Sequence, residues 1–300
     1  MTGSRRPVVI AHRGASGYLP EHTLPGKALA HGMGADFLEQ DVVASSDGQL
    51  LVFHDLHLDQ LTDVARRFPG RARPDGRHYC IDFSLQELRT LTVTERRRRD
   101  GSGPRFPARF PANKGSFRIH TLEEELDLIQ GLNRSTGRRA GVYAEIKDPQ
   151  WHARQQFGLG DRLIETLQAF GYRTAADCFF VQCFCADELR RVRARYGSDL
   201  PLVQLLDETA TVSPEVLAAV AGYAQGIGPT IGHTWPDRGL VSLAREAGLL
   251  VHPYTFRADD LPDGFNTFAE LLTQFIDVLE VDGLFTDFPD LVLAHIRQRD

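Results

Sequence analysis

Eight short apolar runs recur along the chain, separated by longer segments of amphipathic pattern. Most of the runs are rich in β-branched or aromatic residues and are apolar at nearly every position, as is typical of strands buried on both faces of a parallel sheet. The run at 226–229 is the weakest, because it is glycine-rich and holds one isoleucine. We predict strands at residues 8–12, 37–41, 142–146, 179–184, 202–206, 226–229, 249–252 and 283–286.

The amphipathic segments between these runs predict helices, and several begin with a capping signal. Thr121 is followed three residues later by Glu124, as in a capping box, and Ser213 precedes Pro214 at a first helical turn. The predicted helices span residues 23–32, 121–131, 161–170, 186–196, 214–221, 240–247 and 268–279. This alternation predicts an α/β fold, a (β/α)8 TIM barrel with outer helices. An open doubly wound sheet is the alternative, but no glycine-rich fingerprint follows any predicted strand.

Two features interrupt the alternation. Asp47-Gly48 is a strong hairpin signal, and a two-residue turn there would place Asp41 opposite His54. Residues 56–120 have no clear strand–helix pattern and hold five prolines, with one expected helix at 84–91. A stretch of that length predicts an inserted lid or subdomain beside the barrel mouth. We therefore predict one catalytic domain over residues 1–300 that contains an insertion at about 56–120.

Charge and hydropathy exclude several classes of protein. The chain has 34 Lys and Arg against 40 Asp and Glu, a net charge of −6, which argues against a nucleic-acid binder with a general positive field. The basic run 96–99 reads as a solvated loop. No apolar stretch approaches the roughly 18 residues of a membrane span. The apolar residues ahead of His12 are too few for a secretory leader, so we expect a cytoplasmic protein, or a periplasmic one if a signal peptide has been removed.

Polar residues gather at the carboxyl ends of the predicted strands, where TIM barrels place their active sites. Glu39 and Asp41 lie two apart on one strand and so face the same way, and Glu145 adds a third carboxylate from another strand. Three carboxylates repel one another unless a cation neutralises them. An all-oxygen set suits Ca²⁺ or Mg²⁺ better than Zn²⁺. Each motif taken alone could also be a solvent-facing strand end or a structural histidine. The convergence of all of them at one end of the predicted barrel favours an active site.

Other residues at the same strand ends indicate the chemistry. Arg13 and Lys147 would hold an anion beside the cation, and His12 and His54 would move protons. A cation, two basic side chains and two histidines together describe a phosphoester site. We assign His12 as the base and His54 as the acid. For Gln182, Phe184 and Tyr254 we predict contacts with the substrate, with barrel core as the alternative for the two aromatic residues.

These residues fall in a series of motifs that resembles the glycerophosphodiester phosphodiesterase family. The series runs over nearly the whole chain: His12-Arg13-Gly14, Pro20-Glu21-His22-Thr23, Glu39-Gln40-Asp41, Phe53-His54-Asp55, Glu145-Ile146-Lys147 and Phe285-Thr286-Asp287. Segments 71–82, 110–121 and 251–255 further resemble the bacterial periplasmic branch. One departure is His22, where the family more often has asparagine.

The resemblance implies a (β/α)8 barrel with a small insertion and hydrolysis of glycerophosphodiesters to sn-glycerol 3-phosphate and an alcohol. It implies a divalent cation, Ca²⁺ first and Mg²⁺ as the alternative, held by Glu39, Asp41 and Glu145. It also implies acid–base work by His12 and His54, and phosphate contacts from Arg13 and Lys147. The expected partner is a small glycerophosphodiester, with no nucleic acid and no membrane span; a homodimer stays open.

Three other functions remain open on the sequence. A phospholipase D-like enzyme would share the barrel, the histidines and the cation site, but it would need an apolar rim that the sequence does not clearly supply. A non-catalytic binding protein on the same scaffold is disfavoured because every motif residue is present. A metal-dependent aldolase or isomerase could bind a sugar phosphate through Arg13 and Lys147, but two histidines fit phosphodiester cleavage better.

Overall fold

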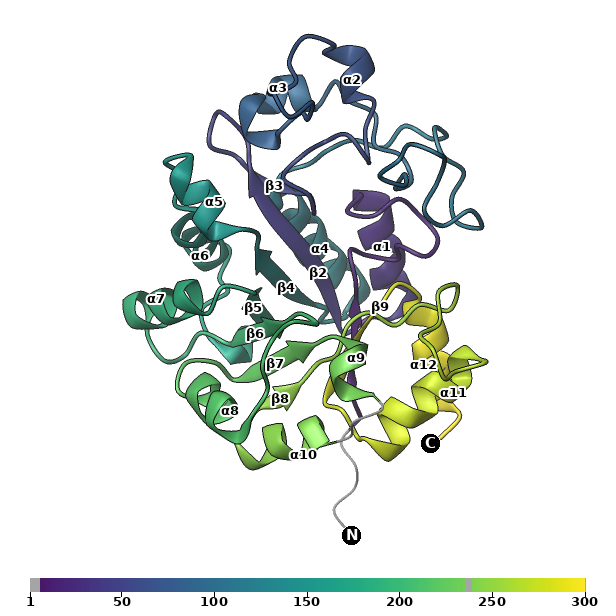
Figure 1. Ribbon diagram of the computed structural model, residues 1–300, viewed down its shortest axis with the longest axis vertical. Coiled ribbons are helices and arrows are strands. Elements are labelled where there is room, and N and C mark those ends of the chain that lie inside the picture. The colour runs from purple at the N-terminus through teal and green to yellow at the C-terminus, as the bar shows by residue number, and fades with distance from the viewer. Residues whose placement is uncertain (1–5, 236–238, 300) are drawn as a thin grey trace.

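Eight parallel strands form the barrel that the apolar runs predict (Figure 1). The computed structural model describes residues 6–235 and 239–299. The order around the barrel is β8-β7-β6-β5-β4-β2-β1-β9, and backbone hydrogen bonds from Asp282 N to Val251 O (3.1 Å) and Phe285 N to Pro253 O (3.0 Å) join its two ends. The strands are β1 (Val8–Ala11), β2 (Phe37–Ala44), β4 (Gly141–Ile146), β5 (Phe179–Cys183), β6 (Leu202–Leu206), β7 (Gly226–Pro229), β8 (Leu250–Val251) and β9 (Gly283–Thr286).

Helices surround this sheet on its outer side (Figure 1). The predicted caps are present: Thr121 closes a capping box with Glu124, and the Ser213 side chain accepts from Val216 N ahead of Pro214. The outer helices are α1 (Leu24–Met33), α4 (Leu122–Thr136), α6 (Leu159–Ala169), α7 (Ala186–Tyr196), α8 (Pro214–Ala221), α10 (Gly239–Glu246), α11 (Phe268–Leu272) and α12 (Pro289–Arg297). Shorter helical segments are α5 (Pro149–Arg154), η2 (Ala175–Asp177), α9 (Ile231–Thr234) and the π-helical η3 (Thr273–Val278), which continues α11.

Large aromatic side chains fill the barrel interior. Tyr143 is fully buried, and its ring lies 4.9 Å from the rings of both Phe180 and Phe285. Ile10 and Val203 belong to the same cluster. The barrel is therefore a packed core, and room for a ligand is left at the mouth rather than along the axis.

The hairpin after β2 has a different register from the one predicted. The strand β3 (Leu50–Val52) pairs antiparallel with β2, but Val42 lies opposite Val52, and Phe53 N donates to Asp41 O (2.9 Å). Asp41 therefore faces Phe53, and the prediction that it faces His54 was wrong by one residue. Ser45 pairs with Gln49 across a three-residue loop in which Gly48 has φ +78°, a common loop that adds one residue to the turn.

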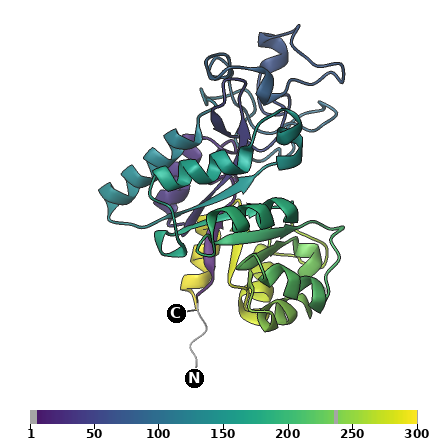
Figure 2. The same ribbon diagram turned by 90° about the vertical axis from the view of Figure 1, so that its left-hand side faces the viewer.

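Residues 56–120 form a small unit beside the barrel mouth, at the top of Figure 1, and Figure 2 shows it extending beyond the barrel. The segment holds α2 (Val64–Arg67), η1 (Cys80–Asp82) and α3 (Leu85–Leu88), the last shorter than the predicted helix. Its apolar side chains, among them Leu58, Phe83 and Leu91, pack with Leu51 and Phe53 into a cluster separate from the main core. The basic run within it is not fully solvated, because Arg96 is only 8% exposed.

No helix among the residues that the structure describes is long and apolar enough to cross a membrane.

Candidate active site

Three carboxylates meet where β2 and β4 end. Glu39 and Asp41 lie on the same face of β2, and the sheet register places Glu145 of β4 directly beside Asp41. All three side chains are buried, at 5% exposure or less. Strand periodicity and parallel pairing thus produce the acidic cluster that the sequence predicts.

Two basic side chains partly neutralise this cluster. Lys147 Nζ lies 2.8 Å from Glu145 Oε1, and Arg13 contacts Glu39 through its backbone N (2.6 Å) and Asp41 through Nε (3.3 Å). Burial and the neighbouring Asp41 still raise the pKa of Glu39 well above its usual range, and burial raises the pKa of Glu145 to about 8. Burial alone would also raise the pKa of Asp41, but Lys147 and other cationic groups hold it below its usual range.

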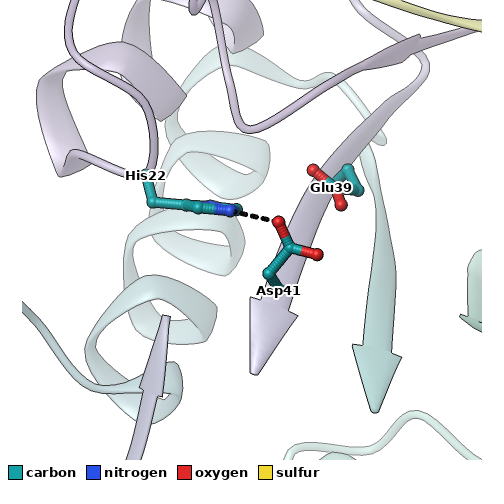
Figure 3. Close-up of side chains that lie close together, drawn as sticks. All are labelled: His22, Glu39 and Asp41. Carbon is teal, nitrogen blue, oxygen red and sulfur yellow. Dashed lines mark hydrogen bonds and ion pairs between the residues drawn. The ribbon is translucent and has the colours of Figure 1, made fainter. Parts of the chain in front are cut away.

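The cluster has the donor set of a hard divalent cation. Asp41 Oδ1 is buried and makes no hydrogen bond with the part of the chain that the structure describes. Ligand atoms of His22, Glu39 and Asp41 all lie within 4.8 Å of one another, and His22 Nε2 lies 2.7 Å from Asp41 Oδ2 (Figure 3). These closely spaced ligand atoms, with an unsatisfied buried acceptor among them, fit a divalent cation. The sequence marked His22 only as a motif position, and its contact with Asp41 was missed.

His12 follows β1 and is held by a carboxylate from the other end of the chain. Its Nδ1 lies 2.6 Å from Asp287 Oδ1, just after β9. Burial would raise the pKa of Asp287, but Arg257, His12 and Arg109 hold it far below its usual range. Burial and then Arg13 lower the pKa of His12 to about 4. A neutral imidazole that donates from Nδ1 to an ionised carboxylate leaves Nε2 as a proton acceptor.

His54 follows β3 and has an equivalent arrangement. Its Nδ1 lies 2.5 Å from Asp55 Oδ1, and the other oxygen of Asp55 accepts from Arg96 (2.8 Å). Desolvation in the cavity and the charges of Arg13 and Lys147 lower the pKa of His54 to about 3. In both histidines, therefore, Nδ1 is in contact with a carboxylate.

One cavity of about 830 Å³ connects these groups. It is lined by the three carboxylates, His12, His54, Arg13 and Lys147, and also by Gln182, Phe184 and Tyr254. Gln182 Oε1 is buried and has no hydrogen-bond partner among the described residues. The rings of Phe184 and Tyr254 lie 6.2 Å apart, and Phe184 is 42% exposed. Every residue predicted from the sequence for the site therefore lines this cavity, which we call the large cavity.

Two polar residues at predicted strand ends do not belong to it. The Gln204 side chain accepts from Tyr223 OH (2.8 Å), and His252 Nδ1 lies 2.9 Å from Tyr143 OH inside the barrel. Conversely, Arg96 was assigned to a solvated loop, yet it binds Glu21 and Asp55 behind the site. A run of four arginines has no internal pattern that marks which member turns inward, so the spacing held no signal for this role.

Glu95 provides a test of the electrostatics beside the site. Its side chain is buried with Oε2 unpaired among the described residues, and burial followed by Glu21 raises its pKa from 4.5 to about 7. Because the folded protein then binds this proton more tightly than the unfolded chain, stability falls as pH rises from about 4.5 to 7. Glu95→Gln should raise the free energy of unfolding at pH 8 by up to about 3 kcal/mol and change it little at pH 4.5.

Urea unfolding at both pH values measures this effect, with Glu123→Gln, an exposed carboxyl on α4, as the control. An equal gain at both pH values would contradict the assignment of a raised pKa to Glu95.

Comparison with known proteins decides the family. The model of the glycerophosphoryl diester phosphodiesterase family matches residues 12–291. The chain belongs to this family. The match begins at His12 and extends past Asp287, so it spans the whole set of site residues. The expected family and enzyme class, a phosphodiesterase, are therefore confirmed.

Relatives and solved structures agree with the family model. A glycerophosphodiester phosphodiesterase of Haemophilus influenzae is 40% identical over 94% of this chain and 88% of its own, and one of Treponema pallidum is 35% identical over 95% and 90%. A solved structure from Silicibacter pomeroyi superposes with a TM-score of 0.77 at 25% identity, covering 99% of this chain and 95% of its own. An Oleispira antarctica phosphodiesterase solved with sn-glycerol-3-phosphate has a TM-score of 0.69 at 22% identity over 97% of each chain, and shares the fold.

Proposed function

We propose that the chain hydrolyses glycerophosphodiesters, such as glycerophosphocholine or glycerophosphoethanolamine, to sn-glycerol 3-phosphate and an alcohol. The observation that carries this proposal is the large cavity, in which two oriented histidines, two basic side chains and three buried carboxylates face the same space. The names of the two bacterial relatives, at 40% and 35% identity over almost the whole chain, support the same substrate class.

Glu39, Asp41 and Glu145 would hold a divalent cation, which supplies charge stabilisation to the phosphate oxygens when bound. We assign Ca²⁺ as the preferred ion and Mg²⁺ as the alternative. Ca²⁺ accepts six to eight oxygen ligands in flexible geometry, whereas Mg²⁺ demands a near-ideal octahedron. Carboxylates fixed on two rigid strands favour the more tolerant ion. The bond from His22 to Asp41 orients one of them.

Arg13 and Lys147 are assigned to the phosphate itself. Both side chains line the large cavity. In this structure Arg13 contacts Asp41 and Lys147 contacts Glu145. A phosphodiester placed between them would gain charge-assisted hydrogen bonds from the guanidinium and the ammonium groups. It would also offset part of the positive charge that lowers the pKa of His54.

The two histidines would divide the proton transfers. His12, held neutral against Asp287, takes a proton from the nucleophile at Nε2. His54 takes up a proton once the bound phosphodiester offsets the positive charge around it, and gives that proton from Nε2 to the departing alkoxide. The nucleophile is water, or the neighbouring glycerol hydroxyl by way of a cyclic phosphate. An intramolecular attack of that kind gains from its effective concentration.

Gln182, Phe184 and Tyr254 would recognise the glycerol group. The unpaired oxygen of Gln182 is an acceptor for a glycerol hydroxyl, and leaving it unsatisfied has a desolvation cost of about 1–3 kcal/mol. The two rings, at right angles to each other, offer a wall to the carbon chain. The insertion of residues 56–120 would act as a lid on one side of the large cavity.

The homodimer and the cellular compartment stay predictions.

A cation titration tests this proposal. EDTA-treated protein should release no glycerol 3-phosphate from glycerophosphocholine, and Ca²⁺ should restore activity and raise the melting temperature. The control is Mg²⁺ at the same free concentration, which should activate less. Full activity in EDTA would overturn the cation site, and stronger activation by Mg²⁺ would overturn the choice of Ca²⁺.

A further inference from the structure

A second cavity of about 410 Å³ lies beside the large one and is strongly basic. Eight arginines line it against three carboxylates, although the chain as a whole carries a net charge of −6. Six of the eight arginines come from the insertion at 56–120. We call this space the arginine-rich cavity.

Four of these arginines have carboxylate partners. Arg96 binds Glu21 and Asp55, Arg13 also binds Glu21, and Arg109 and Arg257 both bind Asp287. These pairs consume all three acidic side chains of the cavity. They are part of the scaffold that holds His12 and His54.

The other four, Arg97, Arg98, Arg99 and Arg105, make no ion pair with a carboxylate of the described residues. Arg97 contacts the Asn113 amide oxygen (2.5 Å), and Arg105 stacks near the Phe106 ring at 5.2 Å. Burial and the facing Arg257 and Arg96 lower the pKa of Arg105. Asp260 acts on Arg105 in the opposite sense, although the two form no ion pair. Guanidinium groups that line one space without an ion-pair partner favour the binding of an anion there.

The position of this cavity relates it to the reaction. His12, Arg13, His54 and Arg257 line both cavities, so the two spaces meet at the proton-transfer groups. The large cavity holds the residues assigned to glycerol, and exposed acids stand at its outer part, Glu208, Asp260 and Asp263. A second anion would be repelled there and attracted to the arginine-rich cavity.

We propose that the arginine-rich cavity binds the alcohol part of the substrate and selects alcohols that carry their own phosphate group. Arg98, Arg99 and Arg105 are the specificity residues. This inference rests on the proposed function and names the substrate class of the same site. The favoured substrate is thus a glycerophosphodiester with a second negative charge beyond the scissile phosphate.

Three substrates with the same glycerol side test the inference: glycerophosphocholine, glycerophosphoglycerol, and glycerophosphoglycerol bearing a terminal phosphate. The unmodified protein should show the highest kcat/KM on the last, by about fivefold or more over glycerophosphoglycerol, and added salt should reduce that ratio. Arg98→Gln, Arg99→Gln and Arg105→Gln should each lower the ratio by about two- to fivefold. All three side chains are exposed, so these variants should fold.

Arg134→Gln, an exposed arginine on α4, is the matched control and should leave the ratio unchanged. Equal losses on all three substrates would overturn the inference, because the arginines would then act on the scissile phosphate or the fold. A preference for glycerophosphocholine would assign head-group selection to the acidic residues and would also overturn it. If none of the substrates is hydrolysed with Ca²⁺ present, the proposed function fails, and the inference fails with it.

Discussion

Asp41→Asn is expected to lower kcat/KM for a glycerophosphodiester on the order of 10³-fold at saturating Ca²⁺. Asparagine keeps the shape of the side chain but removes the charge at the centre of the carboxylate cluster, between Glu39 and Glu145. It also leaves one acceptor oxygen where Asp41 offers two, of which Oδ1 has no hydrogen-bond partner among the described residues. Steady-state kinetics and calorimetric titration with Ca²⁺ measure the two losses separately.

The control for this variant lies at the opposite end of the same strand. Asp36, next to the first residue of β2, accepts a hydrogen bond from Val9 N at 2.8 Å, and it takes no part in the large cavity. Asp36→Asn should retain activity and Ca²⁺ binding. An Asp41→Asn variant with unchanged Ca²⁺ affinity and activity would contradict the cation site.

His12→Ala and His54→Ala should each cost about 10²- to 10⁴-fold on a natural glycerophosphodiester, since both remove a proton-transfer group. The two variants should separate on a p-nitrophenyl phosphodiester, whose leaving group departs without a proton. His54→Ala should keep most of its relative activity on that substrate, whereas His12→Ala should not. The pH profile of kcat/KM for the unmodified protein should be bell-shaped, because one group acts as a base and the other as an acid.

His295→Ala on α12 is the control for this pair, because that ring approaches Asp277 (3.7 Å) and lines neither cavity. Equal losses by the His12 and His54 variants on both substrates would reject the division of roles, and the site itself would stand.

The barrel could be predicted from the sequence because its strands are buried on both faces. A run such as Val142–Ile146 must be apolar nearly throughout, and a charged residue inside it stands out. For the same reason Glu39, Asp41 and Glu145 could be identified as candidates, because burying three acids in strands is unfavourable unless a cation or basic side chains neutralise them. The limits of β8, only Leu250–Val251, were less exact because strand ends depend on the neighbouring pairing.

Features that depend on contacts between distant segments could not be predicted in the same way. The hairpin register depends on whether Gly48 ends a two- or a three-residue loop. The packing of the two strands determines which loop forms, and the local sequence does not. Arg96 lies 75 residues from Glu21 and 41 from Asp55, so no spacing rule links them. The same holds for His22, whose bond to Asp41 spans 19 residues and a change of element.

Phosphorus NMR of a glycerophosphocholine reaction tests the central claim most directly, because it identifies which ester bond is cleaved and whether the cation is needed. With Ca²⁺ the account predicts that the diester signal is replaced by that of sn-glycerol 3-phosphate, and that EDTA prevents the change. Formation of phosphocholine, or of any product at the same rate in EDTA, would contradict it.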